Sequence, residues 1–286
     1  FQGIIFDSLS LIKSFKMNAI LMLGIKAMPV AFLVKILNPK IKLVVNIGGI
    51  EWERPQFNIF LKIYLKLCFK LTKIISNRII IDNKHYKKFF KLKYEDKLSI
   101  IAYGGKIDTR INQKDALQKN RIKFKDFYLS VSRSIEDNKI DELCKIFEEI
   151  EDENLVLISN LSNSVYGKSI LKKYKDIKNI KLIDGLYNKG QLDAVRRSCM
   201  AYIHTHTLCG SAPSLIEMVV CKVPIFSIDV PQNRFTLENE AIFFKTFNDL
   251  KFKIIDGDLP NRPSHNLIDK YKWGNVVKSY ESCFKN

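Results

Sequence analysis

Residues 198–234 hold the residue types and spacing that best suit chemistry in this sequence. The apolar run 201–206 predicts a buried strand, and small residues followed by Pro213 predict a tight turn into the start of a helix. Backbone N–H groups and the dipole at a helix N-terminus attract anions, so this turn would suit a diphosphate. The other interpretation is an ordinary strand-to-helix turn of a doubly wound domain that holds no ligand.

This stretch belongs to a series of strands and helices that must position it. Strands are expected at residues 127–132, 155–159, 180–183, 201–204 and 223–228, and helices near 139–150, 166–174, 191–197 and 213–221. Regular alternation of this kind predicts a Rossmann-like α/β domain with a parallel sheet.

The first hundred residues carry a similar pattern. Strands are expected at 18–25, 41–47, 78–82 and 98–102, and helices at 29–37, 58–75 and 85–90. Polar and aromatic residues 50–55 follow the second strand after Gly48 and Gly49, where open α/β sheets bind ligands. The alternative for Trp52 is a structural role, with its ring packed on the sheet.

Residues 108–125 are polar and lack apolar periodicity, which predicts a connection between two domains. We therefore expect a partial N-terminal domain at 1–110, a linker at 111–125 and a second domain at 126–265. Residues 266–286 should form an amphipathic helix that contains Trp273 and packs back towards the first domain.

The formal net charge of +17 lies mostly in the first part of the 286-residue chain, because residues 1–110 hold 20 Lys and Arg but only 7 Asp and Glu. Such a surface favours anionic lipid, nucleic acid or acidic substrates. Heavy use of Lys for solubility is the alternative. No zinc finger, RNP-like sequence or basic heptad array is visible, so nucleic acid is not an expected partner.

Lysines recur at helical spacing in the long helix expected at 58–75. They are Lys62, Lys66, Lys70 and Lys73, and the apolar neighbours are Leu61, Tyr64, Leu65 and Phe69. Positions three or four apart share a helix face, so a cationic stripe is predicted that could rest on an anionic membrane surface. An ordinary solvated face is the alternative.

Six cysteines are scattered without a C-x-x-C pair, which is typical of reduced core residues in a cytoplasmic protein. The apolar stretch 17–37 is interrupted by Lys26, Pro29 and Lys35, so a strand and a helix are expected there instead of a membrane span. No secretory signal is visible.

Two segments resemble retaining GT-B glycosyltransferases of family four, in the branch of bacterial rhamnosyltransferase-like proteins. Residues 45–54, VNIGGIEWER, are similar to that branch's VNxDGLEWKR, and residues 101–104, IAYG, follow at a similar interval. The second segment, AYIHTH at 201–206 with PSLIE at 213–217, is similar to its AYVHGHSVGGTNPSLLEAM. The resemblance spans essentially the whole chain and implies a GT-B α/β fold, in which two Rossmann-like domains face a cleft.

The chain departs from this family at several positions. The opening strand and glycine-rich loop of the family have no counterpart, so the N-terminal domain is expected to be incomplete and to miss its first strands. Cys209 stands where the wider family has its first motif glutamate, and Gly48 replaces an Asp that faces the sugar. The identity of the donor sugar is therefore left open.

The resemblance implies catalytic roles for Arg133, Lys139, His204 and His206. Arg133 and Lys139 match the basic pair that holds the donor diphosphate, and two cations would stabilise the charge that develops as the sugar leaves. The alternative for Lys139 is a solvated helix start. The two histidines share one strand face, so one of them could be a core residue, and without a third ligand no metal site is expected.

The resemblance also implies the binding residues. Glu217 matches a glutamate that accepts hydrogen bonds from the ribose hydroxyls, and Gly185 matches a glycine near the nucleotide base. The remaining expected donor-binding residues are Gly210, Ser211, Ala212 and Ser214. The expected acceptor-side residues are Glu51, Trp52, Arg54, Tyr103 and Gly104.

The implied activity is transfer of rhamnose or another hexose from a nucleotide diphosphate sugar to a lipid-linked or cell-surface polysaccharide precursor. The reaction would be retaining and would need no metal and no cofactor. The expected place is the cytoplasm, at the inner face of the membrane. The alternative is a truncated, non-catalytic remnant or assembly partner that binds nucleotide sugars.

Overall fold

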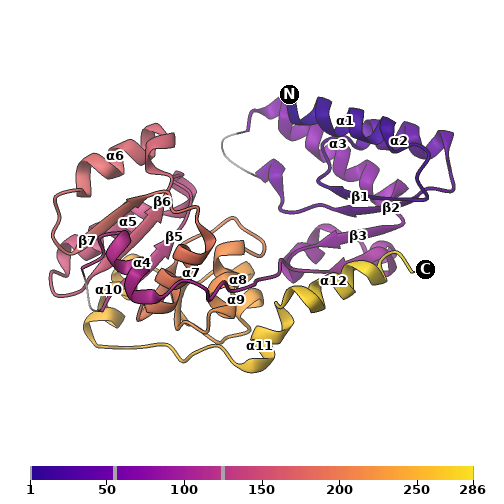
Figure 1. The fold of residues 1–286 in the computed structure, drawn as a ribbon. Coiled ribbons are helices and arrows are strands. Elements are labelled where there is room, and N and C mark those ends of the chain that lie inside the picture. The colour runs from indigo at the N-terminus through magenta and orange to yellow at the C-terminus, as the bar shows by residue number, and fades with distance from the viewer. Residues whose placement is uncertain (1, 54–56, 124–125, 286) are drawn as a thin grey trace. The chain divides into compact units, whose positions relative to one another are not determined.

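The computed structural model describes residues 2–53, 57–123 and 126–285, and the chain divides into two compact units. Unit 1 consists of Phe1–Ala102 and Val276–Asn286, and unit 2 of Tyr103–Asn275. Each unit has a parallel sheet whose strands alternate with helices (Figure 1). This is the α/β architecture that the alternating pattern predicts.

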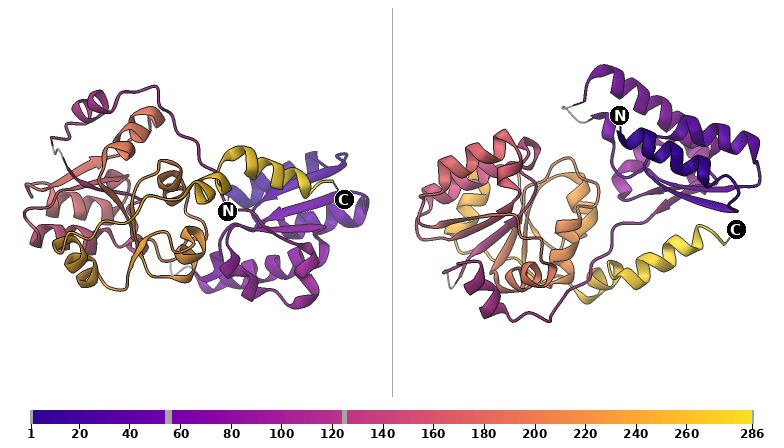
Figure 2. Two further views of the ribbon diagram at one scale, coloured as in Figure 1. Left: turned by 90° about the horizontal axis from the view of Figure 1, so that it is seen from below. Right: turned by 45° about the horizontal axis from the view of Figure 1, so that its top comes forward.

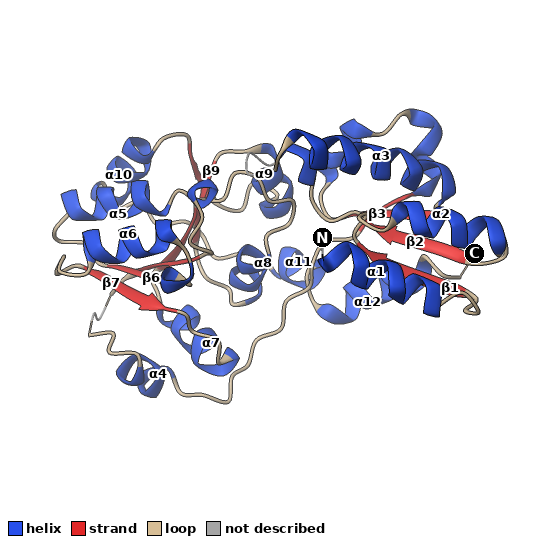
Figure 3. Ribbon diagram, turned by 90° about the horizontal axis from the view of Figure 1, so that it is seen from above, coloured by secondary structure: helices blue, strands red, loops and turns tan. Residues whose placement is uncertain are grey.

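Unit 1 contains a four-stranded parallel sheet in the order β1-β2-β3-β4. The strands are β1 Ala19–Leu23, β2 Lys42–Asn46, β3 Arg78–Ile81 and β4 Leu98–Ile100. The helices α1 Gln2–Lys13, α2 Met28–Leu37 and α3 Ile59–Ile75 lie side by side over one face of this sheet (Figure 3). Parallel strands require such crossover helices.

The central strands of unit 1 are buried on both faces because alternate side chains point in opposite directions. Leu43 and Val45 belong to the core cluster that includes residues of α1, α2 and α3. Val44 packs with Val276 of helix α12, Trp273–Ser282, on the other face. Figure 2 shows this last helix, in yellow, beside the strands of unit 1.

Unit 2 contains a six-stranded parallel sheet in the order β10-β9-β8-β5-β6-β7. The strands are β5 Tyr128–Val131, β6 Leu155–Ser159, β7 Ile180–Asp184, β8 Ala201–His204, β9 Ile225–Ile228 and β10 Ile242–Phe244. The strand order reverses between β5 and β8, and such a switch point is where open α/β sheets bind ligands.

The part of unit 2 that the structure describes contains eight further α-helices. They are α4 Gln113–Lys119, α5 Ile140–Glu149, α6 Val165–Tyr174, α7 Lys189–Ser198, α8 Pro213–Val220, α9 Pro231–Leu237, α10 Phe247–Ile255 and α11 His265–Lys270. Within the described ranges, no helix combines the length and the apolar character that a bilayer-spanning segment needs.

The expected linker at 111–125 contains a helix. Asn112 caps α4 by accepting a hydrogen bond from the Lys114 N–H at 2.8 Å, and Ala116 is buried on the side that packs against α7. One buried alanine in a polar helix gives no apolar periodicity, so the sequence pattern did not reveal this element. The units also divide at residues 102 and 275, where the sequence places boundaries at 110 and 265.

The single helix expected near the C-terminus is two helices, α11 and α12. Between them the Tyr271 carbonyl accepts a hydrogen bond from the Gly105 N–H at 2.8 Å, and Lys272 pairs with Gly105 in an isolated parallel bridge. The backbone there pairs with a distant segment of unit 2 and so leaves the helical path. The helix expected at 85–90 is a 3₁₀ helix, Lys84–Phe89.

Candidate functional site

A pocket of about 480 Å³ lies at the carboxyl edge of the unit 2 sheet. Its wall combines residues that follow β5, β6, β7 and β8 with the first residues of α8. Five of the predicted site residues line it: Arg133, Gly185, His206, Ala212 and Ser214. Parallel strands end at a common edge, so residues far apart in sequence meet there. The volume lies within the range of small-molecule sites.

One side of this pocket is suited to an anion. Helix α8 begins with Pro213, which has no N–H, and no side chain caps its N-terminus. The amide of Ser214 belongs to the first turn, where backbone donors lack intrahelical acceptors. Arg133 is exposed and supplies a cation at the same pocket. A negatively charged group would be stabilised by the helix dipole and by the guanidinium.

Buried polar atoms without partners also line the pocket. Among the described residues, Ser132 Oγ, Ser159 Oγ and His206 Nε2 are buried and make no hydrogen bond. Each belongs to a residue of the pocket wall. Buried polar groups in folded proteins normally have partners, so three unpaired ones around one cavity indicate a polar ligand.

The rings of His204, which ends β8, and His206 contact each other in a tilted arrangement with 49° between their planes. Their ring centroids are 4.4 Å apart, and His204 is fully buried beneath His206. Burial, together with the nearby Arg133 charge, lowers the pKa of His206 to about 4. Burial, and then His206, lowers the pKa of His204 well below its usual value. Both imidazoles are therefore neutral at neutral pH, and only His206 lines the pocket.

Glu217 lies in a network of ion pairs and is not among the residues that line the pocket. Arg196 Nη2 donates to Glu217 Oε2 at 2.5 Å, and Arg196 Nη1 donates to Asp193 Oδ1 at 2.8 Å. Lys189 Nζ lies 2.8 Å from Asp193 Oδ2 and 3.5 Å from Glu217 Oε1. The side chain of Glu217 keeps 28% of its surface exposed, so its carboxylate can still accept further hydrogen bonds.

Three other predicted residues of unit 2, Lys139, Gly210 and Ser211, do not line the pocket. Lys139 has a left-handed backbone with φ of 56° just before α5, and its ammonium pairs with Glu142 at 3.1 Å outside the pocket wall. Gly210 and Ser211 are buried in the turn before α8, and Ser211 Oγ accepts a hydrogen bond from the Tyr103 N–H at 3.4 Å.

Close contacts explain why glycine is present at two of the predicted site positions. Gly185 has φ of +76°, and a Cβ there would come within 2.7 Å of the Tyr187 ring. A Cβ on Gly104 would come within 2.6 Å of the Trp273 ring. Gly104 therefore lets Trp273 pack closely, which is a structural role within unit 2.

The other expected acceptor-side residues belong to unit 1. Trp52 is buried, and its ring lies 4.7 Å from that of Phe69 between centroids, so its position is the structural one weighed as the alternative. Glu51 pairs with Lys26 at 3.2 Å. Arg54 lies outside the described residues. The structure therefore brings several of the expected donor-side residues of unit 2 together around one pocket.

Several residues of the pocket wall escaped the sequence analysis. Ser132, Ser159, Asn160 and Tyr187 all line it. The signal that could have found the first three was a polar residue at the end of a buried strand, here β5 and β6. No group of three or more His, Cys, Asp or Glu side chains suited to a metal ion occurs in the described part of the chain.

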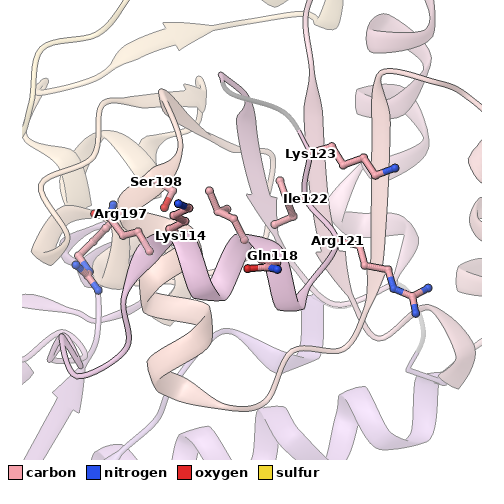
Figure 4. A pocket seen from close by; sticks show the side chains of 9 residues that line it. Lys114, Gln118, Arg121, Ile122, Lys123, Arg197 and Ser198 are labelled. Atoms are coloured by element: carbon pink, nitrogen blue, oxygen red, sulfur yellow. The ribbon is translucent and has the colours of Figure 1, made fainter.

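A larger and more open hollow of about 850 Å³ lies beside α4 and α7. Its cations are Lys114, Arg121, Lys123 and Arg197. Figure 4 shows the side chains of Arg121 and Lys123 extending away on one side and that of Arg197 on the other. Because these charges diverge, the hollow does not concentrate them on one ligand, and the pocket at the sheet edge is the better candidate.

Comparison with protein families gives one match. The model for a domain of unknown function, DUF1972, matches residues 8–106, about a third of the chain. No curated protein sequence matches significantly.

Solved structures match over nearly the whole chain. A sucrose-phosphate synthase from Thermosynechococcus elongatus is 12% identical with a TM-score of 0.70, over 94% of this chain and 73% of that one. A UDP-forming α,α-trehalose-phosphate synthase from Burkholderia xenovorans is 13% identical with a TM-score of 0.72, over 99% and 77%.

The pneumococcal O-GlcNAc transferase GtfA, in complex with UDP and GlcNAc, is 13% identical with a TM-score of 0.68. The match covers 98% of this chain and 60% of that one, so the present chain spans about three fifths of the transferase. These neighbours are GT-B glycosyltransferases, and the likeness confirms the predicted GT-B fold class. At such low sequence identity, the structural likeness shows the fold but not the function.

Proposed function

We propose that the chain is a glycosyltransferase that binds a nucleotide diphosphate sugar in the pocket at the carboxyl edge of the unit 2 sheet. The observation that carries this proposal is the set of unpaired buried polar atoms, Ser132 Oγ, Ser159 Oγ and His206 Nε2, around one cavity beside a cation. A diphosphate would lie between Arg133 and the first turn of α8.

The other end of the pocket suits a nucleoside. Gly185, Leu186 and Tyr187 line it, and aromatic rings stack on nucleobases. Glu217 would accept hydrogen bonds from the ribose through the lone pairs that its ion pairs leave available. Among the structural neighbours, GtfA is in complex with UDP and GlcNAc, which supports a donor of this class.

In this proposal the protein accelerates transfer mainly by charge stabilisation. As the bond between sugar and phosphate breaks, negative charge grows on the diphosphate, and Arg133 and the α8 amides would stabilise it. The neutral His206 can donate or accept a hydrogen bond there without adding a charge that would bind the ground state equally well. No metal and no cofactor enter the proposed reaction.

The finer assignments rest on the family resemblance. We propose a retaining, rhamnosyltransferase-like activity of family four that moves rhamnose or another hexose to a lipid-linked or cell-surface polysaccharide precursor. The proposed place is the inner face of the membrane. Residues 8–106 match a domain of unknown function, so the acceptor is not suggested by that match.

Titration calorimetry of the full chain with UDP and dTDP tests the donor site. Arg133→Ala should weaken diphosphate binding about tenfold to a hundredfold, the range for a lost charge-assisted hydrogen bond. Arg121→Ala, which removes an arginine outside the pocket, is the matched control and should bind as the unchanged protein does. Equal affinity in both variants, or no binding of either nucleotide by the unchanged chain, would reject the site.

Activity is measured separately, by release of UDP or dTDP from labelled nucleotide sugars with and without EDTA. Turnover that persists in EDTA supports the metal-free reaction. Turnover that disappears in EDTA and returns with Mg²⁺ would contradict it. Tight nucleotide binding without turnover on any sugar donor would instead favour the non-catalytic alternative.

A further inference from the structure

The outward face of α3 in unit 1 is apolar. Phe60, Ile63, Leu67 and Ile74 are 79%, 59%, 50% and 55% exposed. Their spacing of three, four and seven residues places them on one side of the helix. The opposite side of α3 packs on the sheet through Leu65, Cys68 and Phe69. The exposed residues are therefore not part of the core of unit 1.

The two neighbouring helices continue this apolar surface. The exposed apolar residues of α2 are Leu33, Ile36 and Leu37, and those of α1 are Ile5, Phe6, Leu9 and Ile12. Helices α1, α2 and α3 lie side by side in both Figure 1 and Figure 3, and α2 contacts each of the other two. We call these exposed residues of three helices the apolar face. Large exposed apolar surfaces mark sites of protein or membrane binding.

The charges on these helices are almost all positive. Lys66 and Lys70 are exposed on α3, and Lys13 is exposed at the end of α1. Asp7 is the one acidic residue in the three helical sequences. Cations flanking an apolar surface match the chemistry of an anionic bilayer, in which lipid chains lie below phosphate groups.

This surface differs from the lysine stripe that the sequence predicts. The Lys73 ammonium lies 4.4 Å from the centroid of the Phe69 ring, so this lysine covers the core instead of facing solvent freely. The expected apolar neighbours Leu65 and Phe69 are buried. The exposed apolar residues of α3 are therefore a different set from the apolar neighbours that the sequence predicts for the stripe.

We propose that the apolar face rests on an anionic lipid bilayer, with Phe60, Ile63 and Leu67 among the lipid headgroups and Lys66 and Lys70 beside the phosphates. Binding of a second copy of the chain to the apolar face is less favourable, because lysines of the two copies would lie close together and repel each other. The proposal does not depend on the nucleotide site, which lies in unit 2.

Co-sedimentation of the full chain with vesicles tests this surface without any nucleotide. The vesicles contain either phosphatidylcholine alone or an equal mixture with phosphatidylglycerol. Binding should be stronger to the mixed vesicles and should fall with added salt. The double variant Lys66→Gln/Lys70→Gln should bind about tenfold or more weakly, because each lysine near an anionic surface contributes on the order of 1 kcal/mol.

A second double variant, Phe60→Ser/Leu67→Ser, tests the apolar contribution and should also lose at least about tenfold in binding. All four positions are exposed, so the variants should keep their circular dichroism and melting temperature. The matched controls are Lys168→Gln/Lys172→Gln and Val165→Ser on α6, which remove exposed residues of the same kinds and should bind normally.

Equal binding to both vesicle types, no binding to either, or unchanged binding by the α3 variants would overturn the proposal. Analytical ultracentrifugation adds a further outcome. A dimer that is abolished by Phe60→Ser/Leu67→Ser, with no vesicle binding, would assign the apolar face to a second copy and would also overturn it.

Discussion

Arg196 lies inside unit 2, 2% exposed, between the carboxylates of Asp193 and Glu217. Burial alone would lower the pKa of its guanidinium, but Glu217 and then Asp193 raise it, so Arg196 stays charged. The result is a buried ion pair that also fixes the carboxylate of Glu217. Arg196 thus positions a residue of the proposed donor site from within the core.

Removal of this guanidinium should be costly. Arg196→Ala removes the buried partner of Asp193, which is 1% exposed but keeps its pair with Lys189, and should lower the free energy of unfolding by about 2–3 kcal/mol. Urea denaturation measures the loss. Arg110→Ala breaks the pair between Asp108 and an exposed guanidinium, and should change the free energy of unfolding much less. Similar losses in the two variants would contradict a special role for the buried pair.

The lowered pKa of His206 predicts that the protein becomes less stable in acid. Its folded pKa of about 4 lies below the ordinary value, so its contribution is fully present above pH 6.5 and is lost as the pH falls towards 4. Between pH 7 and pH 5 the free energy of unfolding should drop by about 2 kcal/mol more in the unchanged protein than in His206→Gln. The carboxylates are present in both proteins, so the comparison reports on His206 together with its effect on the neighbouring His204.

Urea denaturation at the two pH values provides this measurement. Identical losses in the unchanged protein and the variant would show that His206 titrates normally. Arg133, His206 and Ser214 could be predicted from the sequence because they lie in segments that resemble a known family and follow a strand or begin a helix. The pairing of Glu217 with Arg196 could not, because it depends on two helices meeting side by side 21 residues apart in the chain.

Helix α6 contains a glycine that its packing requires. A Cβ on Gly167 would come within 2.2 Å of the Leu161 carbonyl oxygen, which is backbone and cannot move aside cheaply. Gly167→Ala should therefore lower the free energy of unfolding by about 2 kcal/mol or more. Thermal denaturation would show this as a lower melting temperature.

Helix α12 offers the matched control for this change. A Cβ on Gly274 would have nothing within 4 Å, so Gly274→Ala should be neutral or stabilise by up to about 1 kcal/mol. Equal destabilisation by both alanines would show that the close approach of Leu161 in α6 is not rigid.

How well the sequence predicts a helix or strand depends on how much of that element is buried. Strands such as β6 and β8 are continuous apolar runs, and their positions agree with the expected ranges at 155–159 and 201–204. Helices with little burial escaped notice, as α4 did, because only Ala116 is buried in it. The break between α11 and α12 also escaped, because the pairing of Lys272 with Gly105 is a long-range contact.

At the scale of the whole molecule, the alternation of strands and helices was enough to predict an α/β fold, and the family resemblance supplied the GT-B class, which the structural neighbours confirm. The residues that complete unit 1 were harder to assign. Asn46 Nδ2 donates to Tyr280 Oη at 2.6 Å, although the two residues are 234 positions apart. An amphipathic pattern shows that a helix has a buried face, but it does not specify which sheet covers that face.

The late position of Val276–Asn286 affects how the protein folds during synthesis. On the ribosome, one face of the unit 1 sheet, with Val44, Ile80 and Ile101, gains its partners Val276 and Cys283 only after all of unit 2 has been made. Unit 2 is translated in full before then and can fold first, while unit 1 stays partly uncovered. Until Val276 and Cys283 are made, the apolar surface around Val44 and Ile80 would depend on chaperones to stay covered.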